Sequence, residues 1–231
     1  MPAGRLRSLL MLLLVLAGGQ VTGQTNVSPL TWSNNSVSSS FTSAASWVGG
    51  TGSTTVPDAS TLVQFMSTGQ PVVQPLLSTQ AAVLGMTFLQ SSPSYNLTTQ
   101  LTSGVSLTVG QLGILNQSSL AQTIAVPLIL PGATGANVTP VPVSSNGSGA
   151  LFLSGPVAVG AAGVSFGSSA GGSGVVSGVV TSVAQTAGKL TVAGGTWSFS
   201  GANTFTGPVE ITGGTMAVSY THLTLPTICS V

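Results

Sequence analysis

Short runs of apolar and small polar residues recur along most of the chain, and clusters of Gly, Pro, Asn or Ser separate them. Runs of this length that are rich in Val and Thr are typical of β-strands bounded by tight turns. Beyond the N-terminal region, no window sustains the i, i+3, i+4, i+7 apolar spacing of an amphipathic helix. The pattern therefore predicts an all-β protein. The expected strands are Thr61–Phe65, Val72–Leu77, Ala82–Phe88, Val105–Val109, Leu112–Leu115, Thr123–Leu130, Val138–Val143, Ala150–Leu153, Pro156–Val159, Val175–Val183, Lys189–Val192, Thr196–Phe199, Phe205–Ile211 and Thr215–Val218.

One stretch, Gly194–Ser219, repeats itself at a fixed spacing. It opens with Gly-Gly-Thr-Trp-Ser-Phe and returns to Gly-Gly-Thr-Met-Ala-Val, so that Gly195 and Gly214 occupy equivalent places. A weaker echo links residues 149–155 to residues 195–201, at an offset of about two such repeats. Periods of about 20 residues are typical of one coil of a stacked solenoid, whose close coils favour small residues. We therefore favour a parallel β-helix (β-solenoid) over the alternative, a β-sandwich, which would also contain many short strands.

The N-terminal region has the features of a secretory signal peptide. Arg5 and Arg7 precede an apolar run, Leu9–Ala17, which small residues follow. The alternative is a membrane anchor, but the run is shorter than the roughly 20 residues that span a bilayer. The sequence therefore predicts cleavage after Gly19 or Gly23 and a protein that leaves the cytoplasm.

Charged side chains are scarce, and this excludes several functions. The chain has three Lys or Arg, two Asp or Glu and a formal net charge of +1, and the mature part would keep only Asp58, Lys189 and Glu210. One Lys cannot neutralise a series of phosphates, which excludes nucleic-acid binding. Two carboxylates far apart in the sequence do not suit a Ca²⁺ or Mg²⁺ site or a paired-acid glycosidase. We expect no catalytic residue, cofactor or metal site, whereas the low charge favours self-association or adhesion.

Two glycine-rich motifs have the form of sites but lack the partners. Gly163–Gly167 fits the G-x-S-x-G pattern around a nucleophilic Ser165, but only Glu210 and His222 follow as acid and base. Gly171–Gly178 lacks the third spaced Gly, the following helix and the Lys of a phosphate-binding loop. We interpret both stretches as turns.

Asparagine is concentrated in N-x-[Ser/Thr] sequons. In a eukaryotic secretory pathway these would predict heavy N-glycosylation. The interpretation that we favour is that Asn in turns lies naturally beside Ser and Thr. The six Asn of these sequons are Asn26, Asn34, Asn96, Asn116, Asn137 and Asn146.

The aromatic residues and the C-terminal tail suggest no chemistry. Trp32 and Trp47 are expected to cap the first coil, although an aromatic ladder along a solenoid could instead bind glycan rings. The only Cys and the only His, Cys229 and His222, exclude an intramolecular disulfide and a metal site. Both lie in Ser219–Val231, where the repeating pattern stops, and this tail resembles non-native read-through sequence.

The segment Ser198–Gly207, Ser-Phe-Ser-Gly-Ala-Asn-Thr-Phe-Thr-Gly, resembles the autotransporter-associated β-strand repeat, also called the passenger-associated transport repeat. That repeat reads approximately L-x-L-S-G-x-N-T-[YF]-T-G-x-T-x-[IV]-x-x-G-T-L. This chain departs from it at Pro208, Val209 and Met216, where the family favours Gly, Thr and Leu. The positions that carry the repeat are Gly195, Gly201, Asn203, Thr204, Phe205, Thr206, Gly207 and Gly214.

The resemblance implies a domain organisation. It implies a signal peptide at 1–23, a right-handed β-helix passenger with an N-terminal cap region at 24–218, and a truncated or non-native tail at 219–231. Proteins of this family continue into further coils and a membrane β-barrel or sorting tail, so an N-terminal fragment is expected. The family implies secretion or display at the outer membrane, with the repeat aiding passenger folding and export, and it supplies no catalytic residues.

We therefore expect a structural or adhesive cell-surface protein without catalysis. Its expected partners are a cell surface, a glycan or a second copy of the chain, with no nucleic acid and no membrane span. One alternative is a β-helix carbohydrate-active enzyme resembling polysaccharide lyases, which would require Asp58, Lys189 and Glu210 to converge. The other alternative is a eukaryotic, N-glycosylated wall or matrix protein.

Overall fold

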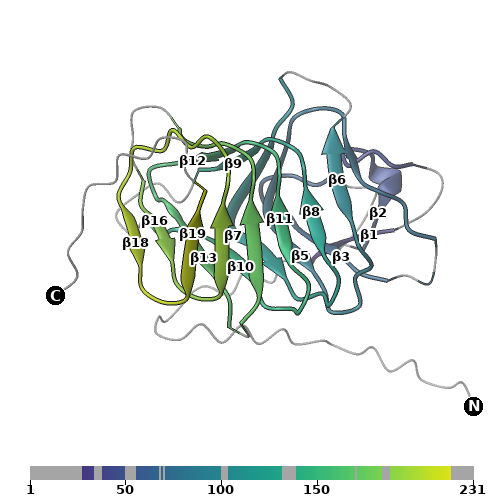
Figure 1. Cartoon of the computed structure of the whole chain (residues 1–231). Helices are drawn as coiled ribbons and strands as arrows, with labels where there is room; N and C mark the ends of the chain where they lie inside the picture. Colours follow the sequence, from purple (N-terminus) through teal and green to yellow (C-terminus); the bar gives the residue numbers. More distant parts are fainter. Residues whose placement is uncertain are drawn as a thin grey trace, which may run out of the picture.

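The chain winds into a β-solenoid of about six turns with almost no helix. Figure 1 shows the coils following one another in sequence order, from the purple β1 and β2 at one end to the yellow β18 at the other. One 3-10 turn, η1 (Ala44–Ser46), lies beside β2. The computed structural model describes residues 28–33, 38–49, 56–67, 69, 71–99, 104–131, 139–169, 171–183 and 188–219. The predicted signal peptide and all of the predicted tail except Ser219 lie outside these residues.

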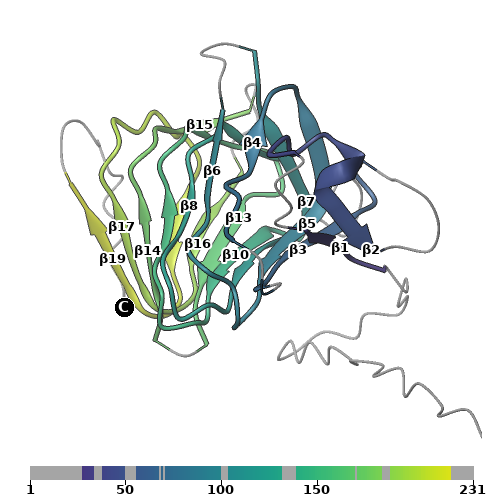
Figure 2. The ribbon, with the colours of Figure 1, turned by 90° about the vertical axis from the view of Figure 1, so that its right-hand side faces the viewer.

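Three faces run along the solenoid, and each is a ladder of parallel strands. Figure 2 shows strands of face two side by side, from β6 through β8, β14 and β17 to β19. Face one consists of β1 (Leu30–Trp32), β3 (Leu62–Phe65), the C-terminal parts of β5 (Ala81–Phe88) and β7 (Leu107–Asn116), β10 (Val141–Ser145), β13 (Val164–Gly167), β16 (Leu190–Val192) and β18 (Val209–Ile211). Face two consists of β4 (Leu76–Leu77), β6 (Asn96–Thr99), β8 (Gln122–Ile124), β11 (Leu151–Leu153), β14 (Ser173–Val176), β17 (Thr196–Phe199) and β19 (Thr215–Val218). Face three consists of the N-terminal parts of β5 and β7, β9 (Leu128–Leu130), β12 (Val157–Val159) and β15 (Val180–Ser182).

Buried and outward-facing residues alternate along each short strand, and the buried ones together form one continuous apolar core. Strands such as β9, β11 and β12 bury their first and third residues and turn the middle one outward. The strand registers then stack inward residues from coil to coil. The step along the chain varies, being short from Val192 to Ile211 and longer from Ile114 to Val143. No coil has a core of its own, so each is stabilised by its neighbours.

The parallel registers decide between the two predicted architectures. Among the paired strands of the described residues, only β1 and β2 (Trp47–Gly49) run antiparallel. A β-sandwich of the immunoglobulin type is built from antiparallel strands. The β-solenoid prediction is therefore confirmed. The echo between residues 149–155 and 195–201 is also explained, because Leu151 pairs with Gly174 and Gly174 pairs with Trp197.

Several of the predicted elements need correction. Val72–Leu77 forms a strand only at its last two residues, β4. The predicted strands Val105–Val109 and Leu112–Leu115 belong to one strand, β7. Val175–Val183 contains the end of β14 and then β15. Thr123–Leu130 contains two strands, β8 and β9, because the chain turns a corner between them. In Phe205–Ile211 only the last three residues form a strand.

Gly163–Gly167 was predicted as a turn, but residues 164–167 form β13, which β10 and β16 hold from both sides. Gly171–Gly178 is likewise not a turn throughout, because residues 173–176 form β14.

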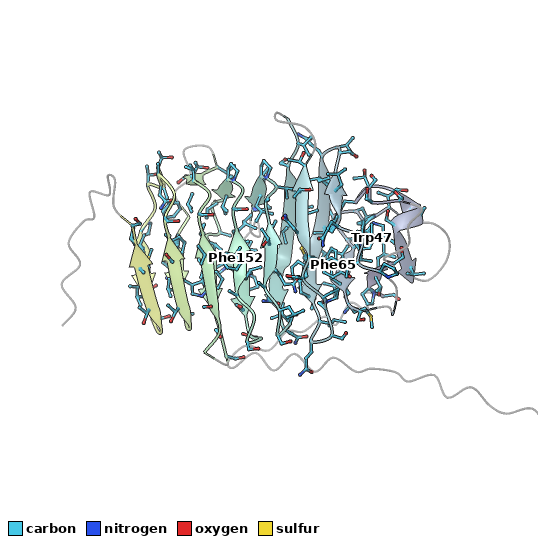
Figure 3. The ribbon with its side chains drawn as sticks, turned by 45° about the vertical axis from the view of Figure 1, so that its right-hand side comes forward. Trp47, Phe65 and Phe152 are labelled. Atoms are coloured by element: carbon cyan, nitrogen blue, oxygen red, sulfur yellow. The ribbon has the colours of Figure 1, made fainter. Side chains whose placement is uncertain are left out.

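The N-terminal end of the solenoid is closed by aromatic side chains. Trp32 and Trp47 meet edge to face with ring centroids 5.1 Å apart, and Phe65 packs against both. The indole N–H of Trp47 donates to the carbonyl of Phe41 at 2.7 Å, and that of Trp32 donates to the carbonyl of Val73 at 2.9 Å. Figure 3 places Trp47 at this end and Phe65 beside it. The two Trp predicted to cap the first coil therefore cover its core while their polar atoms remain satisfied.

Candidate functional site

The repeated Gly-Gly-Thr sequences occupy equivalent places in successive coils. Gly195 and Gly214 have φ values of +75° and +74°, which favour glycine. Thr196 pairs with Thr215, and the Thr215 N–H donates to the carbonyl of Gly195 at 2.8 Å. A Cβ on Gly214 would lie 2.3 Å from that same carbonyl oxygen. Both glycines are therefore required by the turn and by the close approach of the coil beneath.

Two other glycines of the repeat allow the coils to touch. A Cβ on Gly201 would lie 2.3 Å from the carbonyl oxygen of Gly178, and a Cβ on Gly207 would lie 1.9 Å from that of Gly188. Both distances are far below van der Waals contact with backbone atoms that cannot easily move. The repeat thus places glycine where the main chains of neighbouring coils meet at the corners.

Asn203 holds the part of the repeat that is not a strand. Its Oδ1 accepts the N–H of Val180, the first residue of β15, at 2.9 Å. The next backbone N–H, that of Thr204, donates to the carbonyl of Val180 at 3.0 Å. The Asn side chain thereby takes the place of a backbone carbonyl in the ladder. This explains why residues 202–206 stay attached to face three without forming a strand.

The remaining repeat positions pack or face solvent. Phe205 is half-buried against the core and fills the corner next to Gly207. Thr204 and Thr206 are exposed, and the Thr206 hydroxyl lies 3.4 Å from that of Ser182. The positions that carry the repeat are thus all placed within or beside the last two coils, in backbone and packing roles.

The three charged residues do not converge. Lys189 and Glu210 form an exposed ion pair between β16 and β18, which contributes at most about 1 kcal/mol. Asp58 lies before β3, where it accepts hydrogen bonds from Ser60 and Thr61 that hold the pKa of its carboxyl below the usual value. On face one, β5, β7, β10 and β13 lie between β3 and β16, and each strand spacing adds roughly 5 Å. The convergence of Asp58, Lys189 and Glu210 on which the lyase-like alternative depends is therefore not found.

The other suspected motifs have structural placements. Ser165 lies in the middle of β13, opposite Pro142 and Thr191, and so is not on a strand-to-helix elbow. Within the described ranges, no three His, Cys, Asp or Glu side chains gather as metal ligands would. Cys229 and His222 lie outside those ranges.

Three sequon asparagines can be placed, and two of them hold turns. Asn116 is fully buried, donates from Nδ2 to the carbonyl of Gly149 at 2.8 Å and accepts the N–H of Ser118 at 3.0 Å. Asn146 accepts the N–H of Ser169 at 2.9 Å. Asn146 lies in the turn after β10, as the turn interpretation predicts, whereas Asn116 is the buried last residue of β7 and Asn96 is exposed at the start of β6. The asparagines of the other three sequons lie outside the described residues.

Face two carries a regular surface that sequence reasoning missed. The strand registers align the outward-facing residues of successive strands into a central column. A second column follows one position beyond β11, β14, β17 and β19, where the backbone N–H groups donate to carbonyls of the preceding coil at 3.0 Å. The sequence signal was a serine that follows a buried apolar residue at equal intervals, as in Leu153-Ser154, Val176-Ser177 and Phe199-Ser200. No charged side chain stands in either column. Phe152, labelled in Figure 3, lies about midway along the solenoid. The central column is Asn96, Thr123, Phe152, Val175, Ser198 and Ala217, and the second column includes Ser154, Ser177, Ser200 and Ser219.

Comparison with known families identifies the C-terminal coils. Residues 194–218 match the family described as passenger-associated-transport-repeat, which confirms the resemblance over these residues. The repeat and the β-solenoid together fit a repeat protein of the autotransporter-passenger class. No curated protein and no solved structure gives a significant match. In the part of the chain that the structure describes, no helix has the length and apolar character needed to cross a membrane.

Proposed function

We propose that the chain is a structural and adhesive passenger that is secreted or displayed at the cell surface, with its repeat aiding passenger folding and export. The match of residues 194–218 to a passenger-associated repeat supports the export role. The uncharged columns of face two support the adhesive role and are the observation that carries it.

Face two suits a neutral, hydroxyl-rich partner such as an uncharged glycan on a cell surface. Its hydroxyl and amide groups can donate and accept hydrogen bonds, and Phe152 adds a ring that can stack on a sugar. Because the pattern recurs on each coil, many weak contacts can act together on a repetitive partner. A charged partner would find no counter-charge in these columns.

Adhesion can be tested with the full chain immobilised on beads. We expect the beads to bind cells or neutral glycan surfaces equally well at about 50 mM and about 500 mM salt, because salt screens charge pairs and not neutral contacts. Phe152→Asp should weaken binding about tenfold or more, because it replaces the one ring of the central column by a charge. Ser165→Asp, which places the same charge on face one, is the matched control and should bind normally. Adhesion that disappears at high salt, or that both variants lose equally, would contradict the proposal.

We also propose that the chain catalyses no reaction on polysaccharides. The separation of Asp58 from the Lys189–Glu210 pair supports this, since Asp58 and Glu210 do not form the pair of carboxylates that glycoside hydrolysis uses. Release of reducing or unsaturated ends from a panel of polysaccharides, abolished by Glu210→Gln, would overturn it.

A further inference from the structure

One corner of the solenoid contains a chemically reactive pair of residues. Asn146 and Gly147 follow β10 directly, where the chain leaves face one for face two, and they are the only Asn-Gly pair in the sequence. Because glycine has no Cβ, its backbone nitrogen is the least shielded of any residue that can follow asparagine. That nitrogen can attack the side-chain amide of the asparagine before it. Asn146 is therefore the asparagine of this chain that is best placed to lose its amide group.

Contacts between coils explain why both residues of the pair are present. A Cβ on Gly147 would lie 2.0 Å from the carbonyl oxygen of Ser118 in the preceding coil, far below van der Waals contact. Asn146 has a role of its own, because its Oδ1 accepts the N–H of Ser169 in the following coil at 2.9 Å. Stacking thus requires the glycine and uses the asparagine side chain.

The same stacking holds the two reacting groups in place. The N–H groups of Asn146 and Gly147 both donate to the carbonyl of Asn116 in the preceding coil, at 2.7 and 3.0 Å. The Gly147 nitrogen must lose this proton before it attacks, and the Asn146 side chain that it attacks is held by Ser169. Reaction therefore requires the corner to open, and its rate follows the population of the open form.

We propose that Asn146 is a site of spontaneous deamidation that coil stacking controls. In the unstacked chain, the Gly147 nitrogen forms a bond to Cγ of Asn146, and the side-chain nitrogen leaves as ammonia with the proton of the Gly147 amide. Water then opens the succinimide ring at one of its two carbonyls and returns a hydrogen to the Gly147 nitrogen. The product is aspartate or isoaspartate, with one new negative charge. In the stacked chain the residue stays Asn.

The isoaspartate product prevents the corner from closing again. Its main chain passes through Cβ and Cγ and is longer by one methylene group. At this corner the backbone has no room for it, because a Cβ on Gly147 or Gly149 would already lie 2.0 or 2.1 Å from the carbonyl oxygens of Ser118 and Leu120. Conversion at Asn146 therefore records how long a chain has remained unstacked, and this role is independent of the adhesive one.

The test compares the full chain in neutral buffer with the full chain in guanidinium chloride. Mass spectrometry of protease digests quantifies the exchange of NH for O at each asparagine, and chromatography separates isoaspartate from aspartate. We expect Asn146 to convert about tenfold or more faster in guanidinium than in buffer. Asn203, which Thr204 follows, is the internal control and should convert about tenfold or more slower than Asn146 in guanidinium. Gly147→Ala, measured in guanidinium where folding is not required, should slow Asn146 to the rate of Asn203.

Two variants of the folded protein locate the control at this corner. Asn116→Ala removes two buried side-chain hydrogen bonds beside the corner and should speed conversion of Asn146 in buffer about tenfold or more. Asn203→Ala removes one hydrogen bond, to Val180, in a later coil and should change that rate less than about twofold. Trp fluorescence establishes that each variant is folded.

Hydrogen exchange at the Gly147 amide measures the same opening in the parent chain, without a substitution. Folding should slow this exchange and the conversion of Asn146 by factors that agree within about threefold. Equal conversion with and without guanidinium, or conversion of Asn146 no faster than that of Asn203 in guanidinium, overturns the proposal. Equal acceleration by Asn116→Ala and Asn203→Ala, or disagreement between the two factors, overturns the control by this corner.

Discussion

Replacement of Gly201 by alanine tests whether close contact between coils stabilises the repeat. The added Cβ would lie 2.3 Å from the carbonyl oxygen of Gly178, where ordinary contact begins at 3.4 Å, so the coils must separate by about 1 Å. That movement weakens two flanking hydrogen bonds at 3.0 Å, from the N–H of Ser200 and from the N–H of Thr204. Each of these hydrogen bonds contributes about 1 kcal/mol to the free energy of unfolding, whereas alanine adds about 0.5 kcal/mol of stability because it restricts the unfolded chain. We expect Gly201→Ala to lower the free energy of unfolding by about 1.5 kcal/mol, in the range of overpacked cores.

Urea unfolding followed by the fluorescence of the three buried Trp residues measures this change, and amide hydrogen exchange at Ser200 and Thr204 localises it. Gly167→Ala is the matched control. A Cβ there meets only the Ser144 hydroxyl at 3.7 Å, so this variant should be as stable as the parent or slightly more stable. If Gly201→Ala is no less stable than Gly167→Ala, close coil contact at the corners is not what the repeat glycines provide.

Three further predictions concern polar groups. Asn203→Ala removes the acceptor of the Val180 N–H and should cost about 1–2 kcal/mol, with faster hydrogen exchange at Val180 and little change elsewhere; unchanged exchange would refute this role. The pKa of Asp58 is lowered by folding, so its stabilising effect is present above its ordinary pKa of 3.8 and is lost as the pH falls through the folded value. The urea concentration at the unfolding midpoint should therefore decrease when the pH is lowered below about 4, and Asp58→Asn should reduce this pH dependence. An equal decrease in the variant would contradict the role of Asp58. Glu210→Gln breaks the exposed pair with Lys189 and should change the free energy of unfolding by less than about 1 kcal/mol, with a smaller difference at high salt.

The period of the fold could be predicted from the sequence better than the contacts between coils. The spacing of Gly195 and Gly214 indicated the coil because a glycine with positive φ comes directly before both β17 and β19. The contact between Asn203 and Val180 could not be predicted, because coils differ in length and loops set the offset between them. β13 was mistaken for a turn because its local sequence is glycine-rich, whereas the neighbouring strands β10 and β16 supply its stability.

The properties of the site that could be predicted from the sequence are those that depend only on which residues the chain contains. The scarcity of charged residues could be read from the composition. The large distance between Asp58 and Lys189 could not, because it follows from the order of the strands along face one. The columns of face two depend on registers between strands of different coils. Such registers are tertiary information, since a shift of one residue would turn every side chain of a strand to the other side.

The burial of Asn116 bears on how the protein is to be produced. A sugar-attaching secretory host reads the Asn-Gln-Ser sequence on the nascent chain, before β7 and the coil after it close over the side chain. A glycan at that position would keep the Asn116 amide from the carbonyl of Gly149 and wedge two coils apart. Expression in a bacterial cytoplasm or periplasm avoids this modification, so bacterial hosts are the ones in which correctly stacked material is to be sought.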